Sequence, residues 1–160
     1  MMRLVNLFLM FALSGLLLGC SSTKTRTSYD TETDFSALKT YAWMPDVDDA
    51  FPTTERAEHF VNAVDAQLES KGFKLVTDSP DVVIRVHRLV TYREEGASVY
   101  GGTVQFAKSM IRMDFLHPDT GKPMWEGVMD AYLEKDANIE EVKKQIDVGV
   151  ETLFMSFPPD

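Results

Sequence analysis

The chain has 160 residues and a formal net charge of −9, from 25 acidic and 16 basic side chains. Such an acidic surface excludes nucleic acid as a favoured partner and disfavours close contact with anionic headgroups. The length suits a single domain with one hydrophobic core, and the lone cysteine allows no disulfide within the chain.

The N-terminus has the pattern of an export signal. Arg3 provides a positive charge, and residues 4–18 form an apolar run shorter than the roughly 20 residues of a transmembrane helix. Leu17, Gly19 and Cys20 then resemble the lipobox of bacterial lipoproteins, with a leucine three positions before the cysteine and a small residue directly before it. The alternative is an uncleaved signal anchor with a buried thiol, which the short apolar run disfavours.

The lipobox resemblance implies how the chain is processed. In that family the thiol of the cysteine, here Cys20, receives a diacylglyceryl group, the signal is cut before it, and the new amino terminus is acylated, typically with palmitate. Several acyl chains anchor a protein stably, whereas one alone does not. Similar lipoproteins stay at the inner membrane mainly when aspartate follows the cysteine, so Ser21 implies the outer membrane of a Gram-negative cell, with the protein on its periplasmic face.

These features divide the chain into three parts. We predict a lipoprotein signal peptide at residues 1–19, a polar tether at 20–28 and a single α+β domain at 29–160. The tether contains only Ser, Thr, Lys and Arg after the cysteine, which are too polar to pack, although its last part can extend into a first strand.

The first half of the domain predicts a short strand and a helix. Strand-forming aromatics at residues 38–43 are stopped by Pro45. After an acidic loop at 46–52, helical spacing predicts a helix over residues 54–71, with a threonine cap before it and Gly72 as its stop. Its apolar face comprises Ala57, Phe60, Val61, Val64 and Leu68.

The second half predicts several strands. A short strand is expected at 73–76 and a long one at 82–93, followed by a flexible, glycine-containing connection at 94–102. A second long strand around 107–115 and a third at 124–133 flank a hairpin turn. One face of the first long strand carries Val82, Ile84, Val86, Val90 and Tyr92, interrupted by Arg88.

A second helix closes the domain. Asn138 with Glu141 three residues later forms a capping box, and prolines at 158–159 end the helix. Its core stripe comprises Ile139, Val142, Ile146, Val150 and Leu153. The order of elements predicts an α+β fold, an antiparallel sheet of four to six strands with two helices packed on one face.

Two segments are specific enough to suggest a family. They are DFS-x-x-KTYAW at residues 34–43 and FPP at 157–159, after an amphipathic helix, with support from residues 29–30, 71–73 and 125–127. Together they resemble the bacterial lipoprotein family of domain of unknown function 4136, over nearly the whole chain after the signal. The resemblance implies a periplasm-facing α+β domain on a lipid tether, with no agreed activity and no catalytic residues.

The sequence offers no catalytic or metal-binding motif. His59, His87 and His117 fall on a helix, a strand and a turn without ligand spacing, and His117 is expected to form a turn hydrogen bond with Asp119 instead. The acidic residues at 46–55 lack the spacing of a calcium loop. We therefore expect no enzymatic activity, no cofactor and no metal.

One strand face could form a basic binding surface. Arg85, His87 and Arg93 project from one side of the first long strand, and Arg112 from the next strand joins them. The alternative is that these side chains form ion pairs across the sheet, each of which contributes under about 1 kcal/mol to stability. The expected acidic partners are Glu126, Asp130 and Glu134.

The glycine-framed Tyr100 is the other candidate for a binding surface, because an exposed tyrosine in an adaptable loop makes good contacts. Its alternative is a mobile hairpin tip. Overall composition and motifs favour a non-enzymatic envelope accessory or binding module with a periplasmic or envelope protein as partner. The alternative is a lipid-handling or hydrolytic protein, which would require a pocket between sheet and helices lined by convergent polar groups.

Overall fold

The computed structural model describes residues 23–97, 103–134 and 137–159. In these ranges the chain forms one six-stranded sheet and two α-helices, with two short 3-10 turns. The strands are β1 (Lys24–Tyr29), β2 (Thr40–Trp43), β3 (Lys74–Leu75), β4 (Val82–Ala97), β5 (Thr103–Leu116) and β6 (Pro123–Glu134). The helices are α2 (Thr54–Ser70) and α3 (Ile139–Phe154), and the 3-10 turns are η1 (Phe35–Ala37) and η2 (Val47–Ala50).

The sheet has the order β1-β6-β5-β4-β2-β3 and is mixed. Strands β1, β6, β5 and β4 pair antiparallel, whereas β2 pairs parallel with both β3 and β4. The predicted α+β fold is confirmed, but the expectation that every strand pairs antiparallel is wrong at this edge. The cause is the connection, because α2 follows β2 and a helical crossover returns the chain so that the next strand runs in the same direction.

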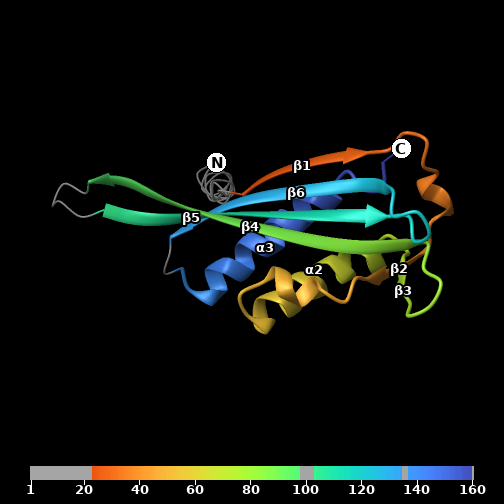
Figure 1. Ribbon diagram of the computed structural model, residues 1–160, viewed down its shortest axis with the longest axis horizontal. Coiled ribbons are helices and arrows are strands. Elements are labelled where there is room, and N and C mark those ends of the chain that lie inside the picture. The colour runs from red at the N-terminus through yellow and green to blue at the C-terminus, as the bar shows by residue number, and fades with distance from the viewer. Residues whose placement is uncertain (1–22, 98–102, 135–136, 160) are drawn as a thin grey trace, which may run out of the picture.

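Both helices pack on one face of the sheet, as predicted (Figure 1). The side chain of Thr53 caps α2 by accepting a hydrogen bond from the N–H of Arg56, and Gly72 follows the helix with a φ of 85°. Asn138 caps α3 by accepting a bond from the N–H of Glu141 at 2.9 Å. Each of the two predicted helices therefore begins at its predicted cap.

The core is completed by an aromatic residue near the C-terminal end of the chain. Phe157 lies with its ring centroid 5.1 Å from that of Phe115, 5.3 Å from Trp125 and 5.4 Å from Phe154. A Cβ added at Gly127 would overlap the Trp125 ring, so the absent side chain there makes room for that ring. The 125–127 and 157–159 segments that carry the family resemblance thus meet in one cluster.

Strands β4 and β5 continue beyond the helices as a two-stranded hairpin (Figure 1). Residues 94–97, predicted as part of a flexible connection, are strand, because antiparallel pairing persists as far as Ala97 opposite Thr103. Tyr92, predicted on the buried face, is instead 67% exposed. The hairpin has passed the end of the helical layer at this point, so the described chain leaves most of this residue uncovered.

Strand β1 begins inside the segment predicted as a tether, residues 20–28. It pairs antiparallel with β6, with Lys24 opposite Asp130 and Tyr29 opposite Trp125. The last part of this segment thus extends into a first strand, as the sequence allowed, because an edge strand needs only backbone pairing on one side. Its polar side chains stay largely in water while its N–H and C=O groups bond to β6.

Asp81 ties the start of β2 to the start of β4. Its Oδ2 accepts hydrogen bonds from the backbone N–H of Lys39 at 2.9 Å and from the N–H and hydroxyl of Thr40, both at 2.8 Å. These bonds lower the pKa of the Asp81 carboxyl below its ordinary value of 3.8, and the bond from the Lys39 N–H has the largest effect. A lowered pKa means that the contribution to stability is complete above the ordinary value and is lost as the pH falls through the folded-state value.

We expect Asp81→Asn to reduce the free energy of unfolding by about 1–2 kcal/mol at pH 7, because the charge-assisted bonds are weakened. Lowering the pH to 2 moves the wild-type carboxyl toward its protonated form, so the difference between the two proteins should shrink. Urea unfolding at both pH values measures it, with Asp119→Asn in the exposed β5–β6 turn as the matched control. An equal loss at both pH values would contradict the role given to the carboxylate charge.

Candidate functional site

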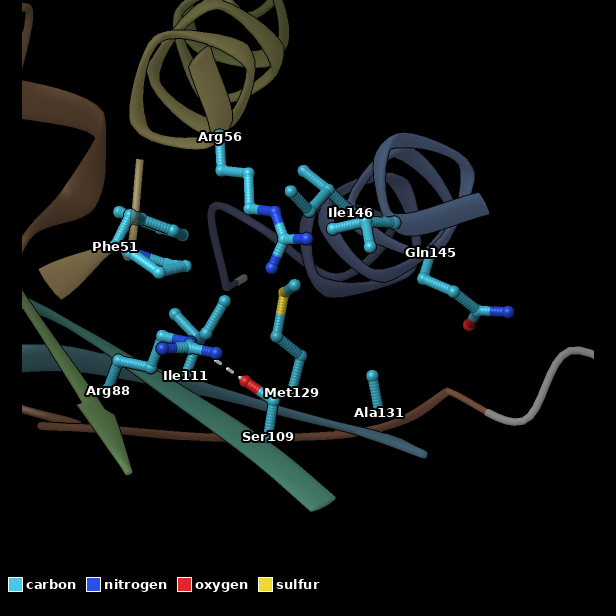
Figure 2. A pocket seen from close by; sticks show the side chains of 11 residues that line it. Phe51, Arg56, Arg88, Ser109, Ile111, Met129, Ala131, Gln145 and Ile146 are labelled. Atoms are coloured by element: carbon cyan, nitrogen blue, oxygen red, sulfur yellow. Dashed lines mark hydrogen bonds between the residues drawn. The ribbon is translucent and has the colours of Figure 1, made fainter. Parts of the chain in front are cut away.

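A pocket lies between the core-facing side of the sheet and the two helices (Figure 2). Its volume is about 40 Å³. Since one water molecule needs roughly 10–15 Å³ measured in this way, the space suits a small chemical group. The lining residues are Phe51, Pro52, Arg56, Arg88, Ser109, Ile111, Met129, Ala131, Val142, Gln145 and Ile146.

Two arginines enter this otherwise largely apolar pocket from opposite walls. Arg56 comes from the first turn of α2 and Arg88 from the core-facing side of β4, and both guanidinium groups reach into the space between sheet and helices (Figure 2). Arg88 pairs with Ile111 of β5 and lies two residues after the buried Val86, on the same face of β4. It is the residue that interrupts the apolar face in the sequence pattern, and its place in the fold explains the interruption.

The two charges are poorly compensated. Arg88 donates one hydrogen bond, from its Nε to the hydroxyl of Ser109 at 3.1 Å, and this acceptor is neutral. The Nε of Arg56 is buried and has no hydrogen-bond partner in the described part of the chain. Burial lowers the pKa of Arg88 below its ordinary value, and the neighbouring charge of Arg56 lowers it further. The eleven described lining residues include no Asp or Glu.

Ser109 is the one hydroxyl among the lining residues, and its contact bears on hydrolysis. A serine nucleophile needs a base within hydrogen-bond reach to take its proton. The group bonded to Ser109 is instead the Nε of Arg88, which can only donate. The geometry therefore uses the hydroxyl to hold the Arg88 side chain.

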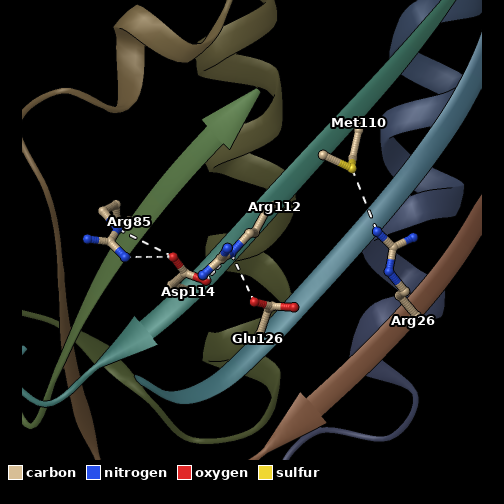
Figure 3. A network of polar contacts seen from close by, with 6 residues as sticks. All are labelled: Arg26, Arg85, Met110, Arg112, Asp114 and Glu126. Atoms are coloured by element: carbon tan, nitrogen blue, oxygen red, sulfur yellow. Dashed lines mark hydrogen bonds and ion pairs between the residues drawn. The ribbon is translucent and has the colours of Figure 1, made fainter. Parts of the chain in front are cut away.

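The opposite face of the sheet carries a row of ion pairs across β4, β5 and β6 (Figure 3). Asp114 on β5 is fully buried, and its two oxygens are held by Arg85 at 2.9 Å and by Arg112 at 2.7 Å. Arg112 also lies 2.9 Å from Glu126 on β6. The bonds to Asp114, with help from the charge of Glu126, raise the pKa of Arg112. Two positive and two negative charges thus balance along this row.

A second group of charges on the same face involves β1. Asp130 on β6 lies 3.1 Å from Arg26 and 3.5 Å from Lys108. Asp130 is one of the acidic partners expected for cross-strand pairing, but its basic partners come from β1 and from a lysine of β5. Together with the Asp114 row, it makes this sheet face a mixed-charge surface.

Three of the predicted binding residues lie on one face of the sheet, and the other two fall wholly or partly outside the described residues. Arg85, His87 and Arg112 do share the open face of the sheet, and His87 is exposed there. The side chain of Arg93 and the whole of Tyr100 lie outside the described residues, as do Cys20 and the side chain of Glu134. A partner-binding role for this surface stays a prediction, with the charges of both Arg85 and Arg112 already engaged by Asp114.

The histidines make local contacts. His59 on α2 lies 2.7 Å from Asp147 on α3, which links the two helices. His117 accepts a bond from the N–H of Asp119 at 3.2 Å, as predicted for the turn. Among the described residues, no group of three or more His, Cys, Asp and Glu side chains is placed to hold a metal ion.

An open depression near the β2–β3 edge is lined by residues that join β2 to α2. Asp65 on α2 accepts hydrogen bonds from the Tyr41 hydroxyl at 2.7 Å and from the Trp43 indole at 2.9 Å. Burial, then the bond to Asp65, raises the pKa of Tyr41. The aromatic residues of the 34–43 segment thus fasten β2 to α2.

Within the described ranges, neither helix has the length and apolar character needed to cross a bilayer.

Sequence reasoning missed two of these residues. Arg56 lies in the first turn of a predicted helix, where a charged residue is usually exposed. That its side chain points inward is visible only once α2 is packed on the sheet. Asp114 alternates with the apolar Met113 and Phe115 and stands opposite Arg85, so the predicted hairpin register would have found it.

The fold and the pocket define an α+β domain in which one sheet face is covered by two helices around a small basic cavity. Residues 25–159 match the family described as "Domain of unknown function (DUF4136)", and the chain belongs to this family. No curated protein matches the chain.

Several solved structures are similar to the chain at low sequence identity. A PDZ domain protein from Parabacteroides distasonis aligns with 99% of this chain at a TM-score of 0.62 and 13% identity, and the chain spans 40% of its length. A minor lipoprotein from Acinetobacter baumannii aligns over 74% of this chain and 91% of its own, with a TM-score of 0.49 and 12% identity. The PelC dodecamer from Paraburkholderia phytofirmans aligns over 82% and 96%, with a TM-score of 0.46 and 10% identity. The likeness to the first of these structures concerns the fold alone.

Proposed function

We propose that this protein is a lipid-anchored, non-enzymatic binding module on the periplasmic face of the Gram-negative outer membrane. The observation that carries the proposal is the spacing between the lipobox and the sheet. Cys20 stands four residues before Lys24, the first residue of β1. Four residues span at most about 14 Å when fully extended. A lipid on Cys20 would therefore hold this edge of the sheet close to the membrane surface.

The second candidate is the lipid-handling alternative, and the pocket between sheet and helices favours it. The pocket has the location that this alternative requires, and it contains convergent polar groups from both layers. The hydrolytic version has no such support, because the pocket serine accepts a bond from an arginine. Binding without catalysis is thus the role common to both candidates, with a periplasmic or envelope protein as a further partner.

We expect Cys20→Ser to abolish lipid attachment and signal cleavage, since the thiol is the group that would be modified. Intact-mass measurement of the purified protein and membrane fractionation test this together. Wild-type protein should lack residues 1–19 and carry the added mass of diacylglyceryl and an acyl chain. A Cys20→Ser protein that is still cut at the same bond and still membrane-bound would overturn the lipid anchor.

Ser21→Asp provides the matched test of location. This change leaves the cysteine intact, so lipidation should persist while the protein moves from the outer-membrane fraction to the inner-membrane fraction. Separation of the two membranes on a sucrose gradient measures the shift. Wild-type protein found in the inner membrane would contradict the proposed location without affecting the lipidation itself.

A further inference from the structure

We propose that the pocket between sheet and helices binds the oxyanion head of a small amphiphile, a carboxylate or phosphate monoester on a slender alkyl body, held between Arg56 and Arg88. This deepens the second candidate function above by naming the class of ligand. It requires the pocket to act as a binding site but does not require the anchor on Cys20.

The first reason is charge. Two guanidinium groups share a small, mostly apolar space, and the lining residues that the structure describes contribute no carboxylate. Burying a charge is costly unless it is paired, and two like charges close together raise the cost. An oxyanion between the two groups would remove both penalties, and the flat guanidinium fork matches carboxylate and phosphate oxygens.

The second reason is the pattern of hydrogen bonds. Arg56 Nε is buried without a partner in the described part of the chain, so the site contains a donor that lacks an acceptor. Arg88 uses its Nε to bond to Ser109, and this contact leaves the two terminal nitrogens of the guanidinium for a ligand (Figure 2). Ser109 is thus a positioning residue, which fixes the plane of the Arg88 fork.

The third reason is the shape and chemistry of the walls. A volume of about 40 Å³ is enough for a carboxylate or phosphate head group and too small for a sugar or a nucleotide. Apart from the arginines, Ser109 and Gln145 the described lining is apolar. Two of its apolar residues reach the surface, since Phe51 is half-buried and Pro52 is exposed. These two residues form an apolar rim on which the first methylenes of an alkyl body would lie as they leave the pocket.

The pocket also lies near the start of the sheet. Gln145 of α3, one of the lining residues, accepts a hydrogen bond from the hydroxyl of Thr23. Thr23 stands three residues after Cys20. If Cys20 carries the lipid, at most about 11 Å of chain separates the anchor from Thr23, which contacts a lining residue of the pocket, so a membrane-derived amphiphile would have a short path to it.

The test measures binding to the full chain, purified from membranes and held in nanodiscs of zwitterionic lipid, whichever anchor it carries. Isothermal titration with octanoate, octyl phosphate, octanol, acetate and inorganic phosphate separates the head group from the alkyl body, and empty nanodiscs correct for partitioning. The variants are Arg56→Gln and Arg88→Gln. Lys74→Gln, which removes one positive charge from the exposed strand β3, is the matched control.

We expect octanoate, octyl phosphate or both to bind one per chain, at least tenfold more tightly than octanol and than the matching free anion. Each arginine variant should weaken this binding tenfold or more, and Lys74→Gln should change it less than twofold. The ligand should raise the Tm of the wild type but not that of Arg56→Gln. The Tm of Arg56→Gln without ligand should be no lower than that of wild type, because the change removes an unpartnered buried donor, so lost binding would not report unfolding.

Three patterns of binding would overturn the assignment. They are octanol binding as tightly as both anionic amphiphiles, free phosphate or acetate binding as tightly as its octyl counterpart, and binding that either arginine variant leaves within twofold of wild type. Absence of binding by both octyl anions would overturn it as well. None of these results bears on the anchor, which the mass of the same purified protein reports separately.

Discussion

Replacing Phe157 by alanine is expected to lower the free energy of unfolding by about 3–5 kcal/mol. The ring is 2% exposed and packs against Phe35 and Phe73 as well as the central aromatic residues of β5, β6 and α3. Its removal would leave a cavity between rigid rings, which cannot collapse to fill the space. Urea unfolding followed by tryptophan fluorescence measures the change, because Trp125 lies in the same cluster.

Met155→Ala is the matched control for this prediction. The residue lies two positions earlier, and it is 77% exposed. Its replacement should change the free energy of unfolding by less than about 0.5 kcal/mol. Losses of similar size for the two variants would show that the C-terminal segment acts through the backbone and that the ring of Phe157 adds little.

The double substitution of Arg85→Met and Arg112→Met is expected to cost about 3–5 kcal/mol of unfolding free energy. It would leave the fully buried Asp114 carboxylate without its two cationic partners. Either single substitution should cost less, because the remaining arginine still holds one oxygen. Chemical unfolding of the four proteins at pH 7 gives the coupling between the two arginines.

Adding Asp114→Leu to the double variant supplies the control. The buried charge is then gone, and an apolar residue of similar size replaces it, so most of the lost stability should return. If the triple variant stays as unstable as the double, the arginines stabilise the sheet through their packing and not through Asp114. The series also decides how freely Arg85 and Arg112 could be used for a partner, since a residue that stabilises the sheet so strongly is poorly available for binding.

Local sequence patterns were sufficient for the helices and for the general fold. The caps at Thr53 and Asn138, the stop at Gly72 and the spacing of the apolar residues are interactions within a few positions, so they can be read along the chain. The turn at residues 117–122 and its two strands were found for the same reason. The α+β class then followed from the order of the elements.

The features that sequence reasoning missed depend on contacts between distant segments. The parallel pairing of β2 with β4 arises from how α2 crosses the sheet. The length of the β4–β5 hairpin depends on backbone hydrogen bonds, which polar residues form as well as apolar residues do, so the side-chain pattern does not show where the strands end. The inward direction of Arg56 depends on how α2 docks. Charged side chains are expected at the surface, so the basic pocket is visible only in three dimensions. The pairing of Asp114 with Arg85, in contrast, follows from the register of the predicted hairpin.

The pairing of β1 with β6 also sets an order of assembly. Lys24 lies opposite Asp130, so the first strand of the domain gains its partner only after almost all of the sheet-forming sequence is available. The β4–β5–β6 meander can form early from neighbouring segments, whereas β1 and the Phe157 cluster require closure over long stretches of chain. A partly emerged chain would hold an unpaired first strand and an open aromatic core, and therefore stays dependent on its last residues to reach a stable fold.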